Sequence, residues 1–362
     1  MKKKDKKRKR LFLKILCVVL TLLLAAAIAF AVLLDRTLGQ INRPDLSEPT
    51  LSNEEIEAIL NEADELDIIE TTAAETLPPQ TGEETQPEQT APPATEVTLP
   101  QANGNLITKT ENVINILLIG QDRRPGQGRQ RSDAMILVTV NKREKTLTMT
   151  SFMRDLYVNL PEWNGRTYSP NRLNVNYPLG GMEMLDKCLE ETFGVVVDHN
   201  IEVDFSGFKA VIDAIGGVDI ELRADEASYI RYAQSGLSAG INRLGGEAAL
   251  AYSRIRELDG DFQRTARQRR VLTAVLEKCR NLDAATLVKL VDTVLPMITT
   301  DMTNIDITGY VVELLPLLPE LTIQTQTIPA NGAYRLDMIR GMSVVVADFE
   351  ACRELLEETI GG

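Results

Sequence analysis

The hydrophobic pattern begins with one long apolar run near the N-terminus, LFLKILCVVLTLLLAAAIAFAVLL over residues 11–34. A helix of this length spans a bilayer, whereas the apolar core of a cleavable signal peptide is shorter, about 7–15 residues. Residues 1–10, MKKKDKKRKR, form a basic tail that should stay in the cytoplasm under the positive-inside rule. We therefore expect a single-pass signal-anchor in the cell membrane, with an extracytoplasmic C-terminal domain. The AIA and AFA triplets leave cleavage open as the alternative.

Polar residues dominate the next part of the chain. The sequence SNEE at residues 52–55 has the pattern of a capping box, and apolar residues follow at helical spacing from Ile56 onward. This pattern predicts a short acidic amphipathic helix. Residues 71–105 are rich in Thr, Pro, Glu and Gln, a composition that cannot bury a core and predicts an extended linker. We expect residues 35–111 to form an acidic, disordered extracytoplasmic stalk that acts as a spacer.

Short apolar runs from Val113 onward predict strands, and the first three are VINILLIG, AMILVTV and KTLTMTSF. Strands and helices then interleave to the end of the chain. The predicted elements are a helix before Gly194, a strand at 201–205, a helix closed by Gly216 and Gly217, a strand at 218–222, a mostly helical region at 245–318, strands at LTIQTQTI and SVVVAD, and a helix at Phe349–Ile360. This alternation predicts one α/β domain over residues 112–362, with helices covering a sheet.

Composition narrows the class of protein. Apolar residues make up 44% of the 362 residues, which is ample for a core, and the formal net charge is −13. Such an acidic chain lacks the basic field that general nucleic-acid binding requires, so we expect no nucleic-acid partner. His199 is the only histidine, which excludes a His-based triad or zinc site, and neither GxGxxG nor GxxxxGK(S/T) occurs. We interpret Cys188, Cys279 and Cys352 as isolated thiols, although a disulfide among them stays open.

Charged residues gather where the predicted strands end. Asp122 follows the first strand directly, and Asp133 stands just before the second. Ligands in open α/β sheets gather beyond the carboxyl ends of strands, and two carboxylates could share Mg²⁺, which prefers carboxylate oxygens and phosphate. The alternative is two solvated loop acids. Arg154 and Asp155 end the third strand, where a strand-end salt bridge is the alternative to a site.

The densest charge lies in YSRIRELDGDFQRTARQRR, residues 252–270, which is rich in arginine and has no lysine. A helix starting here with Asp261 as its N-cap places Arg264 and Gln268 on one stripe with apolar residues, and Arg267 beside that stripe. Arginine presents a planar fork that suits pairs of phosphate oxygens. Arginines and a glutamine above an apolar lining therefore indicate a phosphate group with an apolar neighbour.

Four further arginines of this stretch flank the stripe. Arg269 and Arg270 lie towards the other face of the predicted helix. Arg254 and Arg256 precede the helix and point the same way if their segment is extended. The alternative to a phosphate site is a surface patch in which the arginines pair with the acidic residues of the same stretch, Glu257, Asp259 and Asp261.

These segments, taken in order, resemble the LytR-CpsA-Psr family. The motifs are NILLIGQDRR, RSDAMILVTV, SFMRDLYV, RLNVNY, VDFSGF, GGVDIEL, LGGEAALAYSRIR and GDFQRTARQRR, which together cover about residues 112–280. The resemblance implies a single mixed β-sheet flanked by helices, with an apolar tunnel for a polyprenyl chain. It also implies a Mg²⁺-dependent phosphotransferase that moves a glycopolymer, such as teichoic acid or capsule, from undecaprenyl pyrophosphate to peptidoglycan through a phosphodiester bond.

The resemblance also implies roles for individual residues. Asp122 and Asp133 match the metal-associated aspartates, and with Arg154 and Arg264 they match the catalytic positions. The implied pyrophosphate-binding residues are Arg124, Arg131, Arg154, Arg254, Arg256, Arg264, Arg267 and Gln268. Other matched polar positions are Asp155, Asn174 and Asp204, while Arg172 and Asn176 depart from the usual pattern on the acceptor side.

The sequence leaves two other functions open. One is a non-catalytic polyprenyl-phosphate-binding protein that influences envelope regulation. The other is a lipid pyrophosphatase, in which water replaces the sugar hydroxyl as the attacking group. The expected partners are the polyprenyl-pyrophosphate-linked glycopolymer, the peptidoglycan acceptor and membrane lipid.

Overall fold

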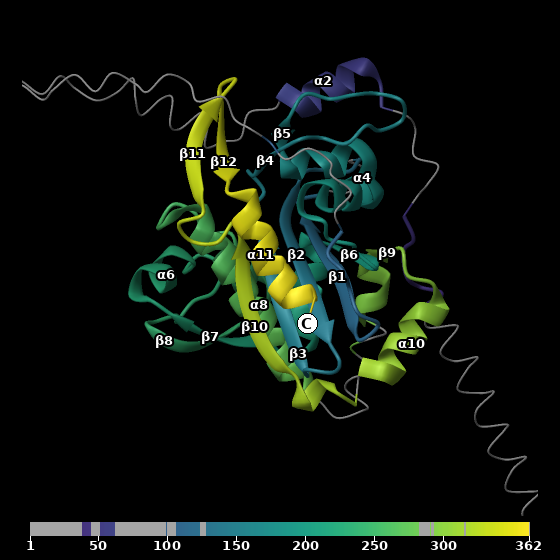
Figure 1. The fold of residues 1–362 in the computed structure, drawn as a ribbon. Helices are drawn as coiled ribbons and strands as arrows, with labels where there is room; N and C mark the ends of the chain where they lie inside the picture. The colour runs from purple at the N-terminus through teal and green to yellow at the C-terminus, as the bar shows by residue number, and fades with distance from the viewer. Residues whose placement is uncertain are drawn as a thin grey trace, which may run out of the picture.

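The computed structural model describes residues 38–44, 51–61, 99, 106–123, 128–281, 290, 293–314 and 316–361. A six-stranded mixed sheet in the order β10-β3-β2-β1-β6-β9 forms its centre (Figure 1). The strands are β1 (Val113–Gln121), β2 (Ser132–Asn141), β3 (Thr146–Phe152), β6 (His199–Asp204), β9 (Ile298–Thr300) and β10 (Thr322–Ile328). β1, β2 and β3 pair antiparallel, β6 is parallel to β1, and β10 is parallel to β3. The predicted α/β class with a mixed sheet is therefore confirmed.

Helices and small hairpins surround this sheet. The helices are α2 (Asn53–Asn61), α4 (Asn176–Phe193), α5 (Phe205–Ala214), α6 (Ala224–Tyr229), α7 (Gly246–Ser253), α8 (Gly260–Cys279), α10 (Asn304–Leu314) and α11 (Phe349–Ile360), with 3₁₀ turns at Leu173–Val175, Leu295–Met297 and Leu318–Glu320. The two-stranded pairs are β4 (Tyr157–Val158) with β5 (Asn171–Arg172), β7 (Val218–Leu222) with β8 (Gly240–Leu244), and β11 (Tyr334–Ile339) with β12 (Met342–Ala347).

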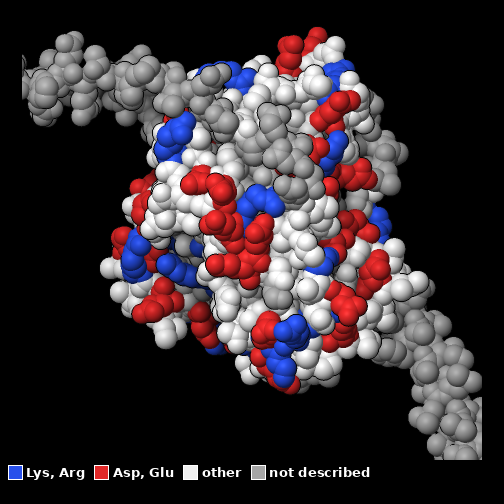
Figure 2. All heavy atoms as spheres, in the orientation of Figure 1, with Lys and Arg blue, Asp and Glu red and all other residues white. Residues whose placement is uncertain are grey.

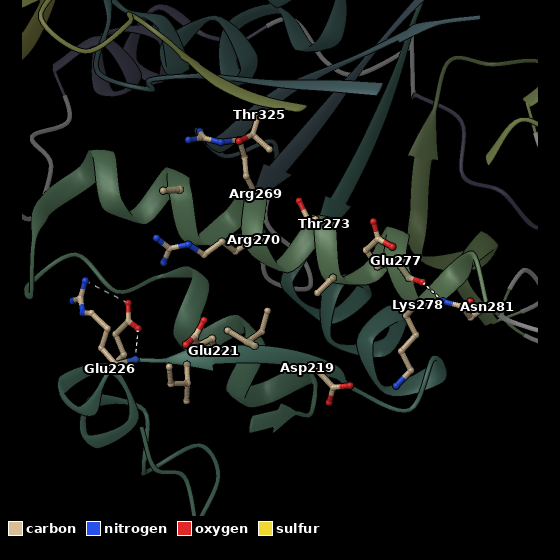
Figure 3. Close-up of a pocket in the computed structure, with 15 residues that line it drawn as sticks. Asp219, Glu221, Glu226, Arg269, Arg270, Thr273, Glu277, Lys278, Asn281 and Thr325 are labelled. Carbon is tan, nitrogen blue, oxygen red and sulfur yellow. Dashed lines mark hydrogen bonds and ion pairs between the residues drawn. The ribbon is translucent and has the colours of Figure 1, made fainter. Parts of the chain in front are cut away.

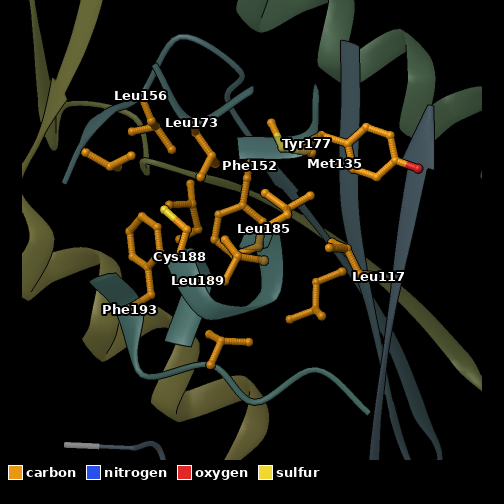
Figure 4. Packing of buried hydrophobic residues seen from close by; sticks show 14 of the residues in the cluster. Leu117, Met135, Phe152, Leu156, Leu173, Tyr177, Leu185, Cys188, Leu189 and Phe193 are labelled. Carbon is orange, nitrogen blue, oxygen red and sulfur yellow. The ribbon is translucent and has the colours of Figure 1, made fainter. Parts of the chain in front are cut away.

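The main core lies between one face of the sheet and the helices α4 and α11. Leu117 and Phe152 point into it from the sheet, and Leu185, Leu189 and Phe193 meet them from α4 (Figure 4). Burial of each such side chain contributes about 1.5–3 kcal/mol. This layer holds the site-bearing ends of β1, β2 and β3 in a fixed arrangement.

A second apolar layer lies on the opposite face of β2 and β3. Alternation along the strands directs Ile136, Val140 and Met149 to this face. Partly buried leucines of α8 and of the chain from α10 onward pack against them, including Leu272, Leu276, Leu314, Leu317 and Leu318. A third apolar cluster unites α5, α6, α7 and β7–β8 against the inner side of α8.

The hydrophobic pattern predicted most of these elements. The capping box of α2 forms, because the Ser52 hydroxyl accepts from the Glu55 amide at 3.2 Å while the Glu55 carboxylate accepts from the Ser52 amide at 2.7 Å. Gly194 ends α4 in the left-handed conformation, as expected of a closing glycine. The cysteines Cys188, Cys279 and Cys352 are free thiols.

Several details differ from the sequence predictions. β9 interrupts the region predicted to be mostly helical, and the elements that were not predicted are β4, β5, α6, β8 and β11. Asp261 is not the N-cap of α8. Asp259 occupies that position, and Asp261 lies inside the first turn, where its carboxylate pairs with Arg256 and Arg264.

The predicted anchor, residues 11–34, and most of the predicted linker lie outside the described residues. Within the described part of the chain, no helix has the length and apolar character needed to cross a membrane. The described segments of the predicted stalk, residues 38–44 and 51–61, pack on the domain, with Leu38 and Ile56 buried against it.

Acidic side chains gather on the surface over α11 (Figure 2). They come from the exposed glutamates of that helix, Glu350, Glu354, Glu357 and Glu358. Several positively charged side chains are instead buried beside the sheet, among them Arg154, Arg264 and Arg267.

Candidate functional site

The sheet register brings three predicted site residues to one end of the sheet. Gly120 pairs with Ala134, but Gln121 pairs with Ser132, so Asp133 is the extra residue of a β-bulge. A bulge of this kind redirects a side chain and ends regular pairing. The loop residue Asp122 and the strand residue Asp133 therefore lie at the same end of the sheet. Arg154 comes to this end because it follows β3, which is the antiparallel partner of β2.

Two buried arginines, Arg154 and Arg264, and the partly buried Arg256 meet two carboxylates here. We call Arg154, Arg256, Arg264, Asp133 and Asp261 the arginine cluster. Nη1 of Arg154 donates to Oδ1 of Asp133 at 2.7 Å. Nη2 of Arg264 lies 2.9 Å from Oδ1 of Asp261, and Nε of Arg256 lies 3.3 Å from the same oxygen. Arg264 also donates to the Asp133 carbonyl at 3.4 Å, which joins α8 to the end of β2.

The cluster carries more N–H donors than its carboxylates accept. Nη2 of Arg256 and Nε of Arg264 are buried without a hydrogen-bond acceptor among the described residues, and Nε of Arg256 has only its 3.3 Å ion-pair contact with Asp261. Burial lowers the pKa of Arg264, and the neighbouring Arg154 and Arg256 lower it further against the opposing effects of Asp261 and Asp133. Buried cationic donors without acceptors are costly to the fold. An oxygen-rich anion that entered the cluster would satisfy them.

Asp155 and Arg172 extend the arginine cluster beyond Arg154. The Asp155 carboxylate lies 3.6 Å from Nε of Arg154 and, through its other oxygen, 3.6 Å from Nε of Arg172. Arg172 is almost fully buried and donates to the Ser343 carbonyl of β12 at 3.0 and 2.8 Å. Arg172 thus ties β5 to β12 and holds Asp155 against Arg154.

The rim of the site is formed by Asp122 and Arg254. Nη2 of Arg254 lies 4.0 Å from Oδ2 of Asp122, and its guanidinium stacks on the Phe205 ring at 4.6 Å. Arg254 closes α7 with helical backbone angles, so the extended segment expected here is wrong at that residue. As a result, Arg254 and Arg256 contact different carboxylates, Asp122 and Asp261.

Arg267 lies apart from the cluster. Its Nε donates to Glu226 at 2.9 Å, its Nη2 to Asp259 at 2.6 Å and its Nη1 to the Ile255 carbonyl at 3.1 Å. The side chain is fully buried. Although burial disfavours its charge, Asp259 and Glu226 hold the pKa of Arg267 above its ordinary value. The structure gives Arg267 the role of joining α8 to α6.

The remaining predicted positions occupy the surroundings. Arg131 donates from Nη2 to the Ile59 carbonyl at the end of α2, at 2.7 Å, and Gln268 is half-buried one turn beyond Arg264. Asp204 caps α5 by accepting from the Gly207 amide at 2.8 Å. Arg124 lies outside the described residues.

Two asparagines after β5 are buried. Both side-chain polar atoms of Asn174 lack a hydrogen-bond partner among the described residues. Its backbone N–H donates to the Arg154 carbonyl at 3.2 Å. Asn176 donates to the Leu173 carbonyl at 2.9 Å. Asn174 is therefore joined through its backbone to Arg154 of the arginine cluster.

Sequence reasoning missed a buried polar group beneath Asp122. Glu202 of β6 accepts from the Tyr177 hydroxyl and from the Gln121 amide, and Nη2 of Arg123 lies 3.8 Å from it. Burial raises the pKa of Tyr177, and Glu202 raises it further. The sequence did hold a signal for this group, because Glu202 interrupts the apolar residues of IEVDF. The segment was interpreted only as a strand.

The two carboxylates at the rim, Asp122 and Asp133, are ligands of the kind that Mg²⁺ prefers. The side chains of Asp122 and Asp133 are 35% and 31% exposed, so both remain open to solvent and substrate. No group of three or more acidic, His or Cys side chains suited to a metal occurs in the described ranges. Mg²⁺ needs only one or two carboxylates when substrate phosphates and waters complete its coordination.

A separate groove of about 1160 Å³ lies on the outer side of α8, between β7 and β10 (Figure 3). Arg269, Arg270, Thr273 and Lys278 line it, which confirms that Arg269 and Arg270 occupy the face away from Arg264. Burial, and secondarily Arg270, lowers the pKa of Arg269 to about 10. None of the residues of the arginine cluster lines this groove.

Comparison with known proteins agrees with this architecture. The teichoic acid transferase TagT of Bacillus subtilis (strain 168), named a polyisoprenyl-teichoic acid–peptidoglycan transferase, is 36% identical over 178 residues, which cover 47% of this chain and 54% of TagT. TagU of Bacillus anthracis (strain CDC 684 / NRRL 3495), with the same kind of name, is 34% identical over 187 residues, which cover 51% of this chain and 58% of TagU. The chain thus spans about half the length of these curated relatives.

The fold itself matches a solved structure described as TagT bound to LIIa-WTA. The TM-score is 0.58 at 26% sequence identity, and the match covers 72% of this chain and 97% of that one. Residues 76–360 also match the LytR_cpsA_psr family, a range that includes the sheet, the arginine cluster and both rim carboxylates. The chain therefore belongs to the LytR_cpsA_psr family.

Proposed function

We propose that this chain is a membrane-anchored phosphotransferase that attaches a glycopolymer from undecaprenyl pyrophosphate to peptidoglycan through a phosphodiester bond. The observation that carries the proposal is the set of buried N–H donors on Arg256 and Arg264 that lack acceptors among the described residues. A pyrophosphate supplies anionic oxygens that guanidinium forks bind in pairs. The names of TagT and TagU support a lipid-linked teichoic acid or a similar polymer as the substrate.

The reaction balances as a displacement at phosphorus. The oxygen of an acceptor sugar hydroxyl forms a bond to the phosphorus next to the glycopolymer, and the bond from that phosphorus to the lipid phosphate breaks. Lipid monophosphate then leaves. Arg154, Arg256 and Arg264 stabilise the charge that develops on it, since positioning and electrostatics dominate phosphoryl transfer.

A carboxylate at the rim takes the hydroxyl proton. Asp122 suits this role better than Asp133, because Arg154 already engages the Asp133 carboxylate at 2.7 Å, whereas Arg254 lies 4.0 Å from Asp122. When bound, Mg²⁺ would be held by Asp122 and Asp133 and would neutralise charge on the substrate phosphates.

In this proposal the lipid chain lies along the apolar layer beneath α8. Leu272 and Leu276 of α8 are only partly buried where they face Ile136 and Met149 of the sheet. Arg264 lies two turns earlier on the same helix, so a phosphate in the cluster would continue into an apolar layer. This arrangement suits an amphiphile with an anionic head and a long apolar tail.

The decisive experiment uses the full chain in vesicles with a lipid pyrophosphate that carries a short sugar, with and without Mg²⁺, and with peptidoglycan fragments. Release of lipid monophosphate together with a phosphodiester-linked sugar on the acceptor would establish the transferase. Release without the adduct would indicate a pyrophosphatase. Tight lipid binding without release, unchanged by Mg²⁺, would indicate a binding protein.

A further inference from the structure

The segment that follows the predicted anchor is part of the domain. Leu38 and Ile41 are buried against Leu295, with Ile307 of α10 packed beside them. The Asn42 backbone continues the sheet edge, because its amide donates to the Ile298 carbonyl at 3.2 Å and its carbonyl accepts from the Thr300 amide at 3.1 Å.

A polar contact fixes the same segment to α10. Nη2 of Arg43 donates to Oδ1 of Asn304, the first residue of α10, at 2.7 Å. In Figure 1 the described chain passes beside β9 and α10 before it reaches α2 at the other end of the molecule. The predicted anchor therefore joins the domain at α10.

This connection limits the distance between α10 and the membrane. Only residues 35–37 separate the apolar run that ends at Leu34 from the buried Leu38. A fully extended chain covers about 3.3–3.6 Å per residue, so the connection reaches on the order of 14 Å. If residues 11–34 span the bilayer, α10 has to lie close to its surface.

The outward side of α10 is apolar. The exposed fractions are 82% for Ile305 and 71% for Val312, and Gly309 lies between them at helical spacing. A surface helix of a water-soluble domain normally turns charged and polar residues outward. The two carboxylates of this helix are engaged elsewhere, since Glu313 pairs with Lys142 at 2.7 Å and Asp306 accepts from the Thr303 amide at 2.8 Å.

We propose that α10 docks into the interface of the bilayer that holds the anchor, with Ile305 and Val312 against the acyl chains. This inference rests on the membrane anchorage included in the proposed function. An amphipathic helix buries its apolar face about 5–10 Å into the headgroup and acyl boundary, which agrees with the short reach from Leu34 to Leu38. The bilayer, rather than a protein partner, is the occupant because it lies within that reach.

Docking at α10 also orients the substrate path. Lys142 and Lys145 of the β2–β3 turn pair with Glu313 and Glu320, so α10 and its continuation lie at the turn end of these strands. Arg154 lies at the opposite end, after β3. The apolar layer beneath α8 begins at α10 and extends beneath β2 and β3. A lipid chain would therefore pass from the bilayer at α10 to the arginine cluster at the far end.

Depth-dependent quenching tests this proposal in the full chain. Trp163 is the only tryptophan, so a Trp163→Phe background accepts a single reporter. Ile305→Trp and Ile241→Trp are matched reporters, because the native side chains are 82% and 79% exposed and only Ile305 lies on α10. The variants are reconstituted into phosphatidylcholine and phosphatidylglycerol vesicles with brominated acyl chains.

We expect the Ile305→Trp variant to lose most of its fluorescence, while the Ile241→Trp variant and Trp163 of the parent chain keep theirs. Equal quenching at positions 305 and 241 overturns the docking. A position 305 signal that stays protected at low as well as high protein-to-lipid ratio also overturns it.

A third reporter separates this inference from the anchorage. Phe30→Trp places a tryptophan in the predicted anchor. Quenching at position 30 without quenching at position 305 leaves the anchorage intact and removes the docking. Absence of quenching at position 30 refutes the anchorage, and the docking that depends on it is then withdrawn.

Discussion

The carboxylate of Asp133 accepts a hydrogen bond from Nη1 of Arg154 at 2.7 Å, and the two partners differ in exposure. The Arg154 side chain is 6% exposed, whereas the Asp133 side chain is 31% exposed. This pair thus connects the open rim of the site to its buried cationic interior. Substrate phosphate would approach along the same direction.

Asp122→Asn should lower transfer by about 10²–10⁴-fold, because in the proposed mechanism this rim carboxylate takes the hydroxyl proton and would hold Mg²⁺. Release of lipid monophosphate at saturating Mg²⁺ measures the effect. Asp219→Asn is the control, since Asp219 forms an exposed pair with Arg243 away from the site. Full activity of the Asp122 variant would remove this residue from the mechanism.

Two arginines one turn apart on α8 should respond in opposite ways. Arg264→Gln removes a buried Nε that lacks an acceptor, and Arg256 still contacts Asp261 when the 2.9 Å pair of Arg264 with that carboxylate is lost. We therefore expect binding of the lipid pyrophosphate to fail, while the free energy of unfolding falls by less than in Arg267→Gln. Arg267→Gln leaves Glu226 and Asp259 without their buried partner and should cost about 3–5 kcal/mol.

Thermal unfolding together with a lipid-binding assay separates the two arginines. If Arg264→Gln unfolded as readily as Arg267→Gln, the cluster would be structural rather than a ligand site.

Stability should fall as pH rises from about 4 to about 7 because of Asp186. Burial raises its pKa from 3.8 to about 7, and only one of its carboxylate oxygens accepts a hydrogen bond, from Asn200 at 2.7 Å. A raised carboxyl pKa stabilises the fold fully below the unfolded value and loses that contribution as pH passes the folded value. The slope is at most about 1.4 kcal/mol per pH unit.

Urea unfolding of the parent and of Asp186→Asn at pH 5, 6, 7 and 8 checks this. The variant should show a flatter dependence of unfolding free energy on pH. Parallel curves for the two proteins would contradict the assignment.

Deletion of residues 71–101 should leave transfer in cells unchanged. Residues 38–44 already fix the domain near the proposed anchor, so its height above the membrane does not depend on the deleted segment. A spacer would instead lose activity in cells but not with soluble substrates. Labelling of peptidoglycan with glycopolymer in cells measures the difference.

The local pattern of the sequence predicted the elements that carry the site. Apolar runs identified β1, β2 and β3, and the stripe through Arg264 placed that residue on the inward side of α8. These predictions succeeded because burial follows from spacing within one element. The family resemblance added the expectation of a single mixed sheet flanked by helices, which the six-stranded sheet confirms.

The failures concern partners that are distant in sequence. Arg267 was grouped with Arg264, but Glu226 lies 41 positions away and its location could not be read from a helical stripe. Glu202 joins Tyr177 only because β6 pairs with β1. β9 has just three residues, and its pairing with β6 rather than its composition makes it a strand.

Ile56 of α2 and Ile360 of α11 belong to the same buried cluster, so the two ends of the described chain close one core. β10, which pairs with β3, is also a late element. If the chain is exported through a translocation channel, as the proposed anchorage requires, its residues arrive in order and the core is incomplete until α11 has emerged. Under that proposal folding is completed only after translocation, and the chain needs protection from proteases until its final residues arrive.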